Sequence, residues 1–227
     1  MERGAVSEPV TMKFDGLASR EWLIYRYPAE IISLGSVLAV QENQTVVFVY
    51  DGQVTDTFIE GNYVLSQNNL PIIDSFENFS RSGKTAFEAK LYFINLKTKL
   101  DILWGTPEPI TLTDSACHLR AYGFLNLKIT DIPLFLRETL KATGNNAVKY
   151  KNTVDFYKSM LNLHLKKLLP AVIREKNIPL QDIAIQVYDI SQEVCRKITP
   201  VFENCGLDIM DFRIQAMSFP DEEKNHF

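Results

Sequence analysis

The sequence lacks the hydrophobic segments that mark membrane-spanning and secreted proteins. No stretch approaches the run of about eighteen apolar residues that a transmembrane helix requires. The N-terminal segment MERGAVSEPVTM lacks the apolar core of a secretory signal peptide. We therefore expect a cytoplasmic protein, with any membrane contact peripheral and at the inner face of the membrane.

Cysteine and histidine are scarce and scattered. The three cysteines, Cys117, Cys195 and Cys205, show no CxxC spacing, and no two histidines lie four residues apart. Cys117 and His118 are adjacent, but neighbours on a strand point to opposite faces and cannot easily hold one metal ion. Because no nucleophile, base and orienting group can be named together, we expect reduced thiols and no metal, cofactor or catalytic site.

The chain also lacks an excess of positive charge. Its 24 Lys and Arg against 28 Asp and Glu give a formal net charge of −4. A nucleic-acid-binding surface normally needs a basic field, so we expect no nucleic acid partner. Hydrophobic residues make up 46% of the 227 residues, enough for a real core in one large domain or two small ones.

What the sequence does contain is a long alternating segment, Cys117–Asp131, with the sequence CHLRAYGFLNLKITD. Its odd positions are small or apolar, and its even positions are polar or aromatic. Only a β-strand places such residues on opposite faces. We predict a strand with one face on the core and the other, which carries Tyr122 and Phe124, open to solvent or to a partner.

Before this strand, β signals dominate. Thr45–Tyr50 is β-branched and aromatic, and Asp51-Gly52 is a strong hairpin turn. We predict a small antiparallel meander that continues through Gln53–Glu60 and Tyr63–Leu65. An irregular stretch, Ser66–Gly83, then precedes further strands at Thr85–Asn95 and Leu96–Trp104.

After the strand the pattern changes to a helical period. We predict a short helix at Ile132–Ala142 and two long helices, from Thr153 and from Leu180, the first kinked or split at Pro170. Gly206 suits a left-handed C-cap, and Leu207–Phe219 is a final strand with Met210 in phase with Phe212. The strands at 117–130 and 207–219 should share a sheet covered by the helices. The predicted parts are a flexible arm at 1–16, a β-rich subdomain at 17–115, an αβ subdomain at 116–220 and a polar tail at 221–227.

The tripeptide Gly83-Lys84-Thr85 is similar to the end of a phosphate-binding loop. That loop needs an earlier glycine, where Asn78 stands, and a helix after the threonine. Because the residues after Thr85 alternate as a strand, a plain turn is favoured.

Four segments of the chain resemble one known family. They are VQENQTVVFVYDGQVTDTFIEGNYVL at 40–65, GKTAFEAKLYFIN at 83–95, WGTPEP at 104–109 and CGLDIMDFRIQAMSFPDEE at 205–223. They resemble the SPFH superfamily (stomatin, prohibitin, flotillin, band seven), in its bacterial virion-core-protein-like branch. Ser82 stands where that branch usually has a glycine, and Ala86 where it has a proline.

The resemblance implies an α+β fold, with an N-terminal antiparallel β subdomain followed by an αβ subdomain with two long helices packed on a sheet. It also implies a non-enzymatic, membrane-associated scaffold that self-associates. The alternatives are a soluble adaptor that binds a protein partner without touching lipid and, less favoured, a nucleotide-binding or hydrolytic enzyme.

Two groups of residues, one aromatic and one basic, are candidates for contact with an anionic membrane surface. Phe76 and Phe79, in the irregular stretch, could enter a bilayer interface or a neighbouring subunit. The predicted long helix carries Lys158, Lys166 and Lys167, although lysines that are simply solvated are the favoured interpretation. Tyr122 and Phe124 are candidates for contact with a protein partner, including a membrane-bound one.

Overall fold

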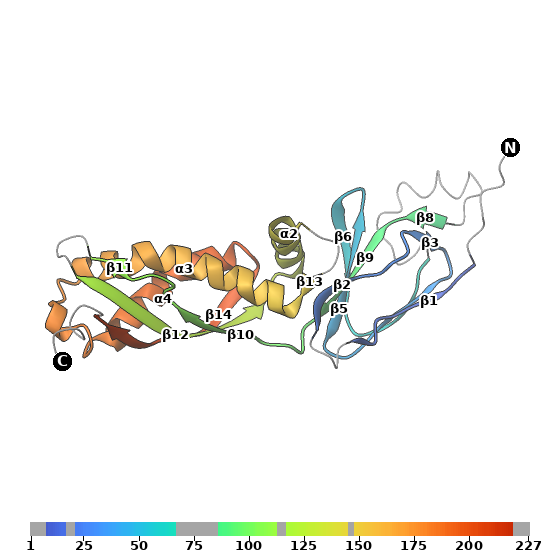
Figure 1. The fold of residues 1–227 in the computed structure, drawn as a ribbon. Coiled ribbons are helices and arrows are strands. Elements are labelled where there is room, and N and C mark those ends of the chain that lie inside the picture. The colour runs from blue at the N-terminus through green and yellow to red at the C-terminus, as the bar shows by residue number, and fades with distance from the viewer. Residues whose placement is uncertain (1–7, 17–20, 67–85, 113–116, 145–147, 220–227) are drawn as a thin grey trace. The chain divides into compact units, whose positions relative to one another are not determined.

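Figure 1 shows the fold in a computed structural model. The structure describes residues 8–16, 21–66, 86–112, 117–144 and 148–219. The chain divides into two compact units, one made of residues 1–98 and 139–151 and the other of residues 99–138 and 152–227. Each unit has its own sheets and buried residues.

The first unit consists of small β-sheets. The largest has the strand order β13-β2-β9-β5-β6, a second has the order β1-β4-β7, and β3 pairs with β8. The strands are β1 (Thr11–Met12), β2 (Trp22–Arg26), β3 (Ile31–Ser33), β4 (Val37–Val40), β5 (Gln44–Tyr50), β6 (Gln53–Phe58), β7 (Gly61–Val64), β8 (Ala86–Glu88), β9 (Lys90–Asn95) and β13 (Val148–Lys149). Apolar side chains from several of these strands form a core that includes Leu38, Phe48, Phe87 and Phe93.

The hairpin between β5 and β6 forms where the sequence predicts it. Asp51 has a φ of 47° and Gly52 a φ of 75°, the two positive values of a type I′ turn. The predicted meander does not continue, because β7 pairs with β4 and not with β6. The strand predicted at Thr85–Asn95 is in fact two strands: β8 pairs with β3, whereas β9 pairs with β2 and β5.

The second unit is organised on β12 (His118–Ile129). This strand pairs with β10 (Leu100–Gly105) and β11 (Ile110–Thr111) on one side and with β14 (Leu207–Ser218) on the other, always antiparallel. Its odd residues Leu119, Ala121, Leu125 and Leu127 are buried, so the predicted alternation is confirmed. The prediction that the strands at 117–130 and 207–219 share one sheet is confirmed as well.

Two long helices, α3 (Tyr150–Glu175) and α4 (Val187–Glu203), cover the buried face of this sheet (Figure 1). Helix α2 (Ile132–Thr143) follows β12 along the chain, and a 3-10 turn, η3, lies at Leu180–Asp182. Tyr157 of α3 is fully buried, and its ring centroid lies 6.4 Å from that of Phe135 and 6.2 Å from that of Phe202. The predicted α+β fold with long helices packed on a sheet is therefore confirmed.

The structure corrects the helix prediction in three details. Helix α3 begins before Thr153, and it is continuous through Pro170, so it is not split there. A proline removes one backbone hydrogen bond, and the buried Leu165, Leu169 and Val172 around it hold the helix in place. Helix α4 begins at Val187, because the residues from Leu180 form the 3-10 turn.

The end of α4 matches the prediction. Gly206 has a φ of +72°, and a Cβ there would lie 2.3 Å from the carbonyl oxygen of Asp131. Only glycine fits both the left-handed backbone and this close approach. Strand β14 then begins, and two bulges against β12 shift its phase, so Met210 is 59% exposed and not buried with Phe212.

Candidate interaction surfaces

Metal ligands do not cluster among the residues that the structure describes. These residues contain no group of three or more His, Cys, Asp or Glu residues able to hold a metal ion. Burial raises the pKa of the Cys195 and Cys205 thiols, the opposite of what a reactive cysteine needs. The tripeptide at 83–85 lies outside the described residues, but Ala86–Glu88 after it is a strand, where a phosphate-binding loop needs a helix.

An open cavity of about 390 Å³ lies in the first unit, lined by Val49–Gly52 and Glu88–Lys90. Its wall is mostly the turn of the β5–β6 hairpin. Its charged lining residues are Asp51, Glu88 and Lys90.

The second unit presents the outer face of its sheet, which we call the open sheet face. Tyr122 and Phe124 lie on it, as predicted, and the cross-strand partner of Phe124 is Leu103 of β10. Leu103 is 70% exposed and Tyr122 is 55% exposed. An aromatic and aliphatic cluster on an uncovered sheet is an unusual surface for an isolated protein and typical of a contact site.

Charged and polar residues surround this cluster. Asp101 accepts a hydrogen bond from the amide of Asn126 on the neighbouring strand. Arg213 forms a bidentate pair with Asp211, with both N–O distances at 2.9 Å. The open sheet face therefore has the apolar centre and polar rim that protein interfaces share.

The other face of the sheet explains why Gly123 interrupts β12. The rings of Trp104 on β10 and Phe212 on β14 stack with centroids 5.6 Å apart and planes within 2°. Gly123 is the cross-strand partner of Trp104. A Cβ on Gly123 would lie 1.9 Å from the Arg213 carbonyl oxygen and 2.7 Å from the Trp104 ring. The two rings meet across the middle strand only because that strand has no side chain there.

The outer edge of β14 is covered at its middle by α4. The buried hydroxyl of Ser191 accepts a hydrogen bond from the Ile214 N–H at 3.1 Å and donates one to the Phe212 carbonyl at 3.4 Å. These backbone groups point away from β12 and would otherwise have no partner. A single side chain therefore satisfies both groups of an edge strand.

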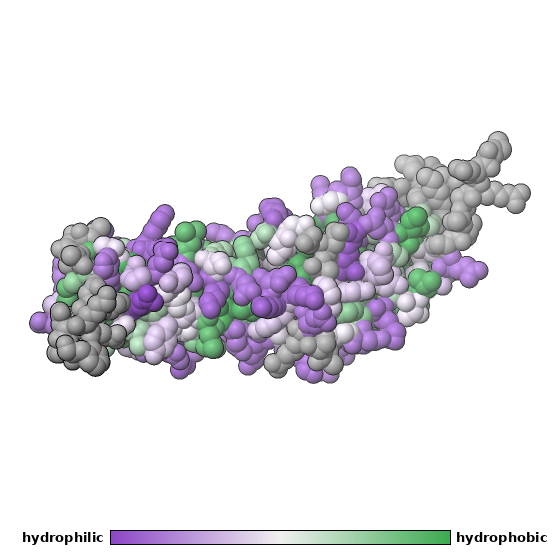
Figure 2. Space-filling model, viewed as in Figure 1, coloured by the Kyte–Doolittle hydropathy of each residue, from purple (hydrophilic) through white to green (hydrophobic). Residues whose placement is uncertain are grey.

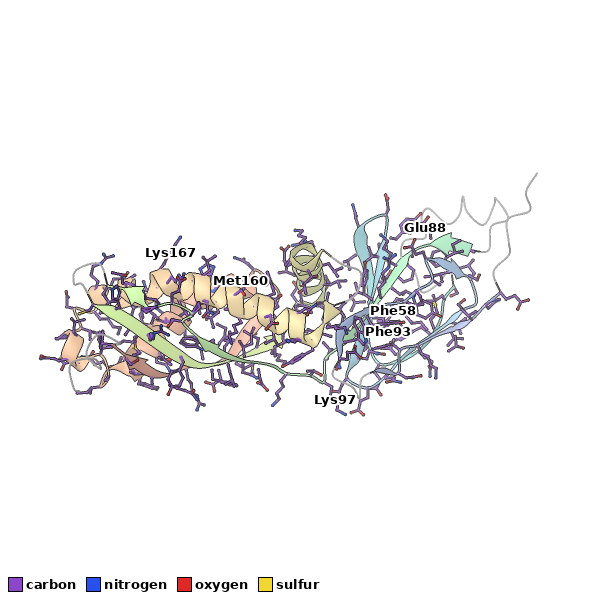
Figure 3. The ribbon with its side chains drawn as sticks, in the orientation of Figure 1. Phe58, Glu88, Phe93, Lys97, Met160 and Lys167 are labelled. Carbon is purple, nitrogen blue, oxygen red and sulfur yellow. The ribbon has the colours of Figure 1, made fainter. Side chains whose placement is uncertain are left out.

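Helix α3 carries a second stripe besides the one that packs in the core. Phe156, Met160, Leu163, Lys167 and Arg174 recur at three-, four- and seven-residue spacing, which places them on one side of the helix. Leu163 is 63% exposed, and Phe156 and Met160 are half-buried. Figure 3 labels Met160 and Lys167 on α3, and Figure 2 shows hydrophobic and hydrophilic residues interspersed along this part of the surface. We call this set the outer stripe of α3.

The three lysines predicted on this helix differ in their surroundings. Lys167 is exposed and belongs to the outer stripe, and Lys158 is half-buried. Lys166 is exposed and pairs with Glu108 at 3.4 Å. The lysines project from a helix that lies on the buried face of the sheet, whereas Tyr122 and Phe124 lie on the open face. The structure thus divides the predicted residues between two surfaces.

Some functional candidates lie outside the prediction or outside the structure. Phe76 and Phe79 fall in residues that the structure does not describe. The sequence analysis missed Leu103 and Leu163, which are 70% and 63% exposed. Leu163 could have been found, because its seven-residue spacing from Phe156 is visible in the sequence. Leu103 could not, because its neighbour on β12 is known only from the register.

Comparison with protein-family models gives a match over most of the chain. None of the curated proteins matches this chain. Among the residues that the structure describes, no helix combines the length and apolarity needed to cross a membrane. The family model described as SPFH domain-Band 7 family matches residues 22–227, nearly the whole chain. By its fold and by this match, the chain belongs to the SPFH domain–Band 7 family.

Proposed function

We propose that this protein is a non-enzymatic, self-assembling scaffold of the virion-core-protein-like branch that binds the cytoplasmic face of an anionic membrane. Membership of the SPFH domain–Band 7 family indicates a membrane-associated scaffold role in general terms. The observation that carries the membrane part is the outer stripe of α3, in which apolar and basic side chains share one exposed side of a helix.

The composition of the stripe suits a lipid surface. Leu163, with Met160 and Phe156 beside it, can enter the boundary between headgroups and acyl chains. Lys167 and Arg174 flank them and form no ion pair with any residue that the structure describes. Each contributes about 1 kcal/mol near an anionic surface. Lys166 contributes less because Glu108 already neutralises it.

These magnitudes predict weak, reversible attachment by a single chain. Two basic residues give about 2 kcal/mol, or roughly a 30-fold gain in binding to anionic over neutral lipid. Such a chain attaches firmly only when several copies bind together, because linked copies multiply their affinities. Weak attachment of single chains is thus consistent with a scaffold that works as an assembly.

Vesicle co-sedimentation tests this proposal. The full chain should bind vesicles that contain phosphatidylserine at low salt, bind phosphatidylcholine vesicles much less, and dissociate as salt is raised. Changing Lys167→Glu together with Arg174→Glu should lower the bound fraction at least tenfold, because two attractions become repulsions. Leu163→Asp should also weaken binding.

Lys97→Glu is the matched control. Lys97 is an exposed lysine on the turn after β9, and it belongs to the first unit, whereas the outer stripe of α3 belongs to the second. Its reversal should leave vesicle binding within a factor of two or so of the wild type. Failure of the wild-type chain to bind anionic vesicles at low salt would remove direct membrane attachment and favour a soluble adaptor instead.

A further inference from the structure

We propose that the outer edge of β10 is a strand-addition site that binds an extended segment of a partner protein. The segment pairs with β10 as a further strand of the sheet, on the side of β10 that faces away from β12. This inference goes beyond the proposed function, because it gives the scaffold a way to hold other proteins. It involves no residue of the outer stripe of α3 and does not depend on membrane attachment.

The register of β10 shows which of its backbone groups point outward. The Thr106 N–H donates a hydrogen bond to the Ala121 carbonyl at 2.9 Å, so these two residues form a hydrogen-bonded pair of the ladder. Such pairs alternate along an antiparallel ladder, and the register of β10 with β12 is regular throughout. The N–H and C=O groups of Asp101, Leu103 and Gly105 therefore point away from β12.

This edge is open in the part of the chain that the structure describes. There β10 pairs with β12, and no other helix or strand runs beside it. The opposite edge of the sheet is different, because Ser191 of α4 occupies the backbone groups at the middle of β14. One edge of the sheet is thus closed by a side chain, and the other presents its backbone groups.

Strand β10 also lacks the features that keep an edge strand from pairing. Its six residues, LDILWG, include no proline and no lysine, and they form no bulge against β12. Asp101 is the one charged residue among them, and its carboxylate accepts a hydrogen bond from Asn126. Leu103, in the middle of the strand, is 70% exposed. An edge strand in this state is either an aggregation hazard or a binding site, and the closed edge at β14 argues for a binding site.

The side chains along β10 define the chemistry of the segment. In an antiparallel pairing, three alternate residues of the segment face Gly105, Leu103 and Asp101 in turn. An aromatic side chain suits the position opposite an edge glycine, a branched apolar one suits Leu103, and a threonine hydroxyl can donate to Asp101. Lys99 stands two residues before Asp101 and offsets its charge, so the segment needs no charged residue of its own.

A second copy of this chain fits the edge less well. Two β10 strands paired about Leu103 set Asp101 of each copy against Gly105 of the other. Two of the three outward pairs then join a side chain to a residue that has none, whereas cross-strand side-chain contacts supply much of the stability of paired strands. A partner segment with an aromatic residue at one position and threonine at the other fills both places.

A peptide probe tests the inference on the full chain. In acetyl-Ser-Tyr-Thr-Val-Thr-Thr-Ser-amide the tyrosine, valine and final threonine face Gly105, Leu103 and Asp101. Fluorescence anisotropy of the labelled probe should saturate with a dissociation constant on the order of 100 µM, because a short flexible peptide loses much of its freedom on binding. The same probe with proline in place of valine lacks the N–H that faces Leu103, and it should bind about tenfold more weakly or worse.

Variants of the strand test the site from the other side. Leu103→Pro removes an outward N–H and leaves the ladder with β12 in place, so the chain should fold and bind the probe at least about tenfold more weakly. Leu103→Lys, which puts a charge on the edge, should act in the same direction. Circular dichroism checks that both variants fold. Leu163→Asp, on the outer stripe of α3, is the control and should leave probe binding unchanged.

Amide hydrogen exchange locates the contact. The Leu103 amide should exchange fast in the free chain and slowly with the probe, whereas the Trp104 amide, bonded to β12, should exchange slowly in both. Three results would each overturn the inference: no saturable binding up to about 1 mM probe, a Leu103 amide protected in the free chain, or binding that neither Leu103 variant weakens. A dimer seen by sedimentation velocity and lost in Leu103→Pro would assign the edge to a second copy instead. Vesicle binding by Leu103→Lys should equal that of the wild type, so failure here leaves the membrane proposal untouched.

Discussion

Gly123 offers the sharpest test of how the second unit is held together. Changing Gly123→Ala adds one Cβ, 1.9 Å from the Arg213 carbonyl oxygen and 2.7 Å from the Trp104 ring. The carbonyl belongs to the paired backbone of β14 and cannot move without disturbing the sheet. Overpacking of this kind costs about 1–3 kcal/mol, and loss of the Trp104–Phe212 stack adds about 1 kcal/mol. We expect a loss of about 3 kcal/mol in the free energy of unfolding.

Urea denaturation followed by tryptophan fluorescence measures this loss. The chain has two tryptophans, so a Trp22→Phe background leaves Trp104 as the reporter of the second unit. With a slope of about 2 kcal/mol per molar urea, the midpoint should fall by about 1.5 M.

Gly105→Ala is the matched control. Gly105 lies on the adjacent strand, one residue from Trp104, and a Cβ there would lie 3.4 Å from the Tyr122 Cβ and 3.8 Å from the Ala121 carbonyl oxygen. Both are ordinary van der Waals contacts, and the change should cost less than about 1 kcal/mol. If the two alanine variants unfold at the same urea concentration, the close approach at Gly123 is not what requires glycine.

Three further predictions concern single side chains. Ser191→Ala should lower the free energy of unfolding by about 1–3 kcal/mol in urea denaturation, because it leaves two buried backbone groups without partners. Ser159→Ala is the control: it removes only an exposed hydroxyl that donates a hydrogen bond to the Asp155 carbonyl, and it should cost less than about 0.5 kcal/mol. Burial raises the pKa of the Asp56 carboxyl above its ordinary 3.8, so the folded state holds the carboxyl proton more tightly than the unfolded state does. The stability that this bound proton contributes is present below pH 3.8 and is lost as the pH rises through the pKa of the folded state. Asp56→Asn should therefore unfold at a higher temperature than the wild type at pH 7 and at a similar one near pH 3; equal stability at pH 7 would contradict this. The Cys195 thiol, whose pKa burial raises, should react with a thiol reagent at pH 7 more slowly in the folded chain than in urea, and equal rates would show that it is not protected.

The local structure of this protein could be predicted wherever one short segment determines it. Asp51-Gly52 specifies its turn because both residues accept positive φ, and Gly206 ends α4 for the same reason. The alternation of β12 was visible because its two faces differ in polarity along the whole strand. The family was also visible, through segments that span most of the chain.

The pairing of strands could not be predicted in the same way. Nothing near β7 indicates that it leaves β6 for β4, because that choice depends on residues brought together by the rest of the fold. The bulges in β14 likewise follow from its register with β12, so the periodicity of the sequence placed Met210 on the wrong face. Sequence periodicity gives the faces of a strand only up to the next bulge.

The candidate surfaces, too, could be predicted from the sequence only in part. Tyr122, Phe124 and Lys167 could be chosen because single residues in a strand or helix pattern identify them. The clusters they belong to depend on neighbours from other strands or on a second helical stripe. Leu103 belongs to the open sheet face because β10 pairs with β12. Leu163 belongs to the outer stripe of α3 because the packing of the helix leaves its side chain exposed.

The hydroxyl of Ser191 has a consequence for how copies of this chain can accumulate. Strand-to-strand joining at the edge of a sheet has no natural end, because each added chain offers a new edge, and it leads to fibres. At the middle of β14 the groups that an incoming strand would need are already occupied. The middle of β14 is thus protected against the strand addition that builds insoluble filaments.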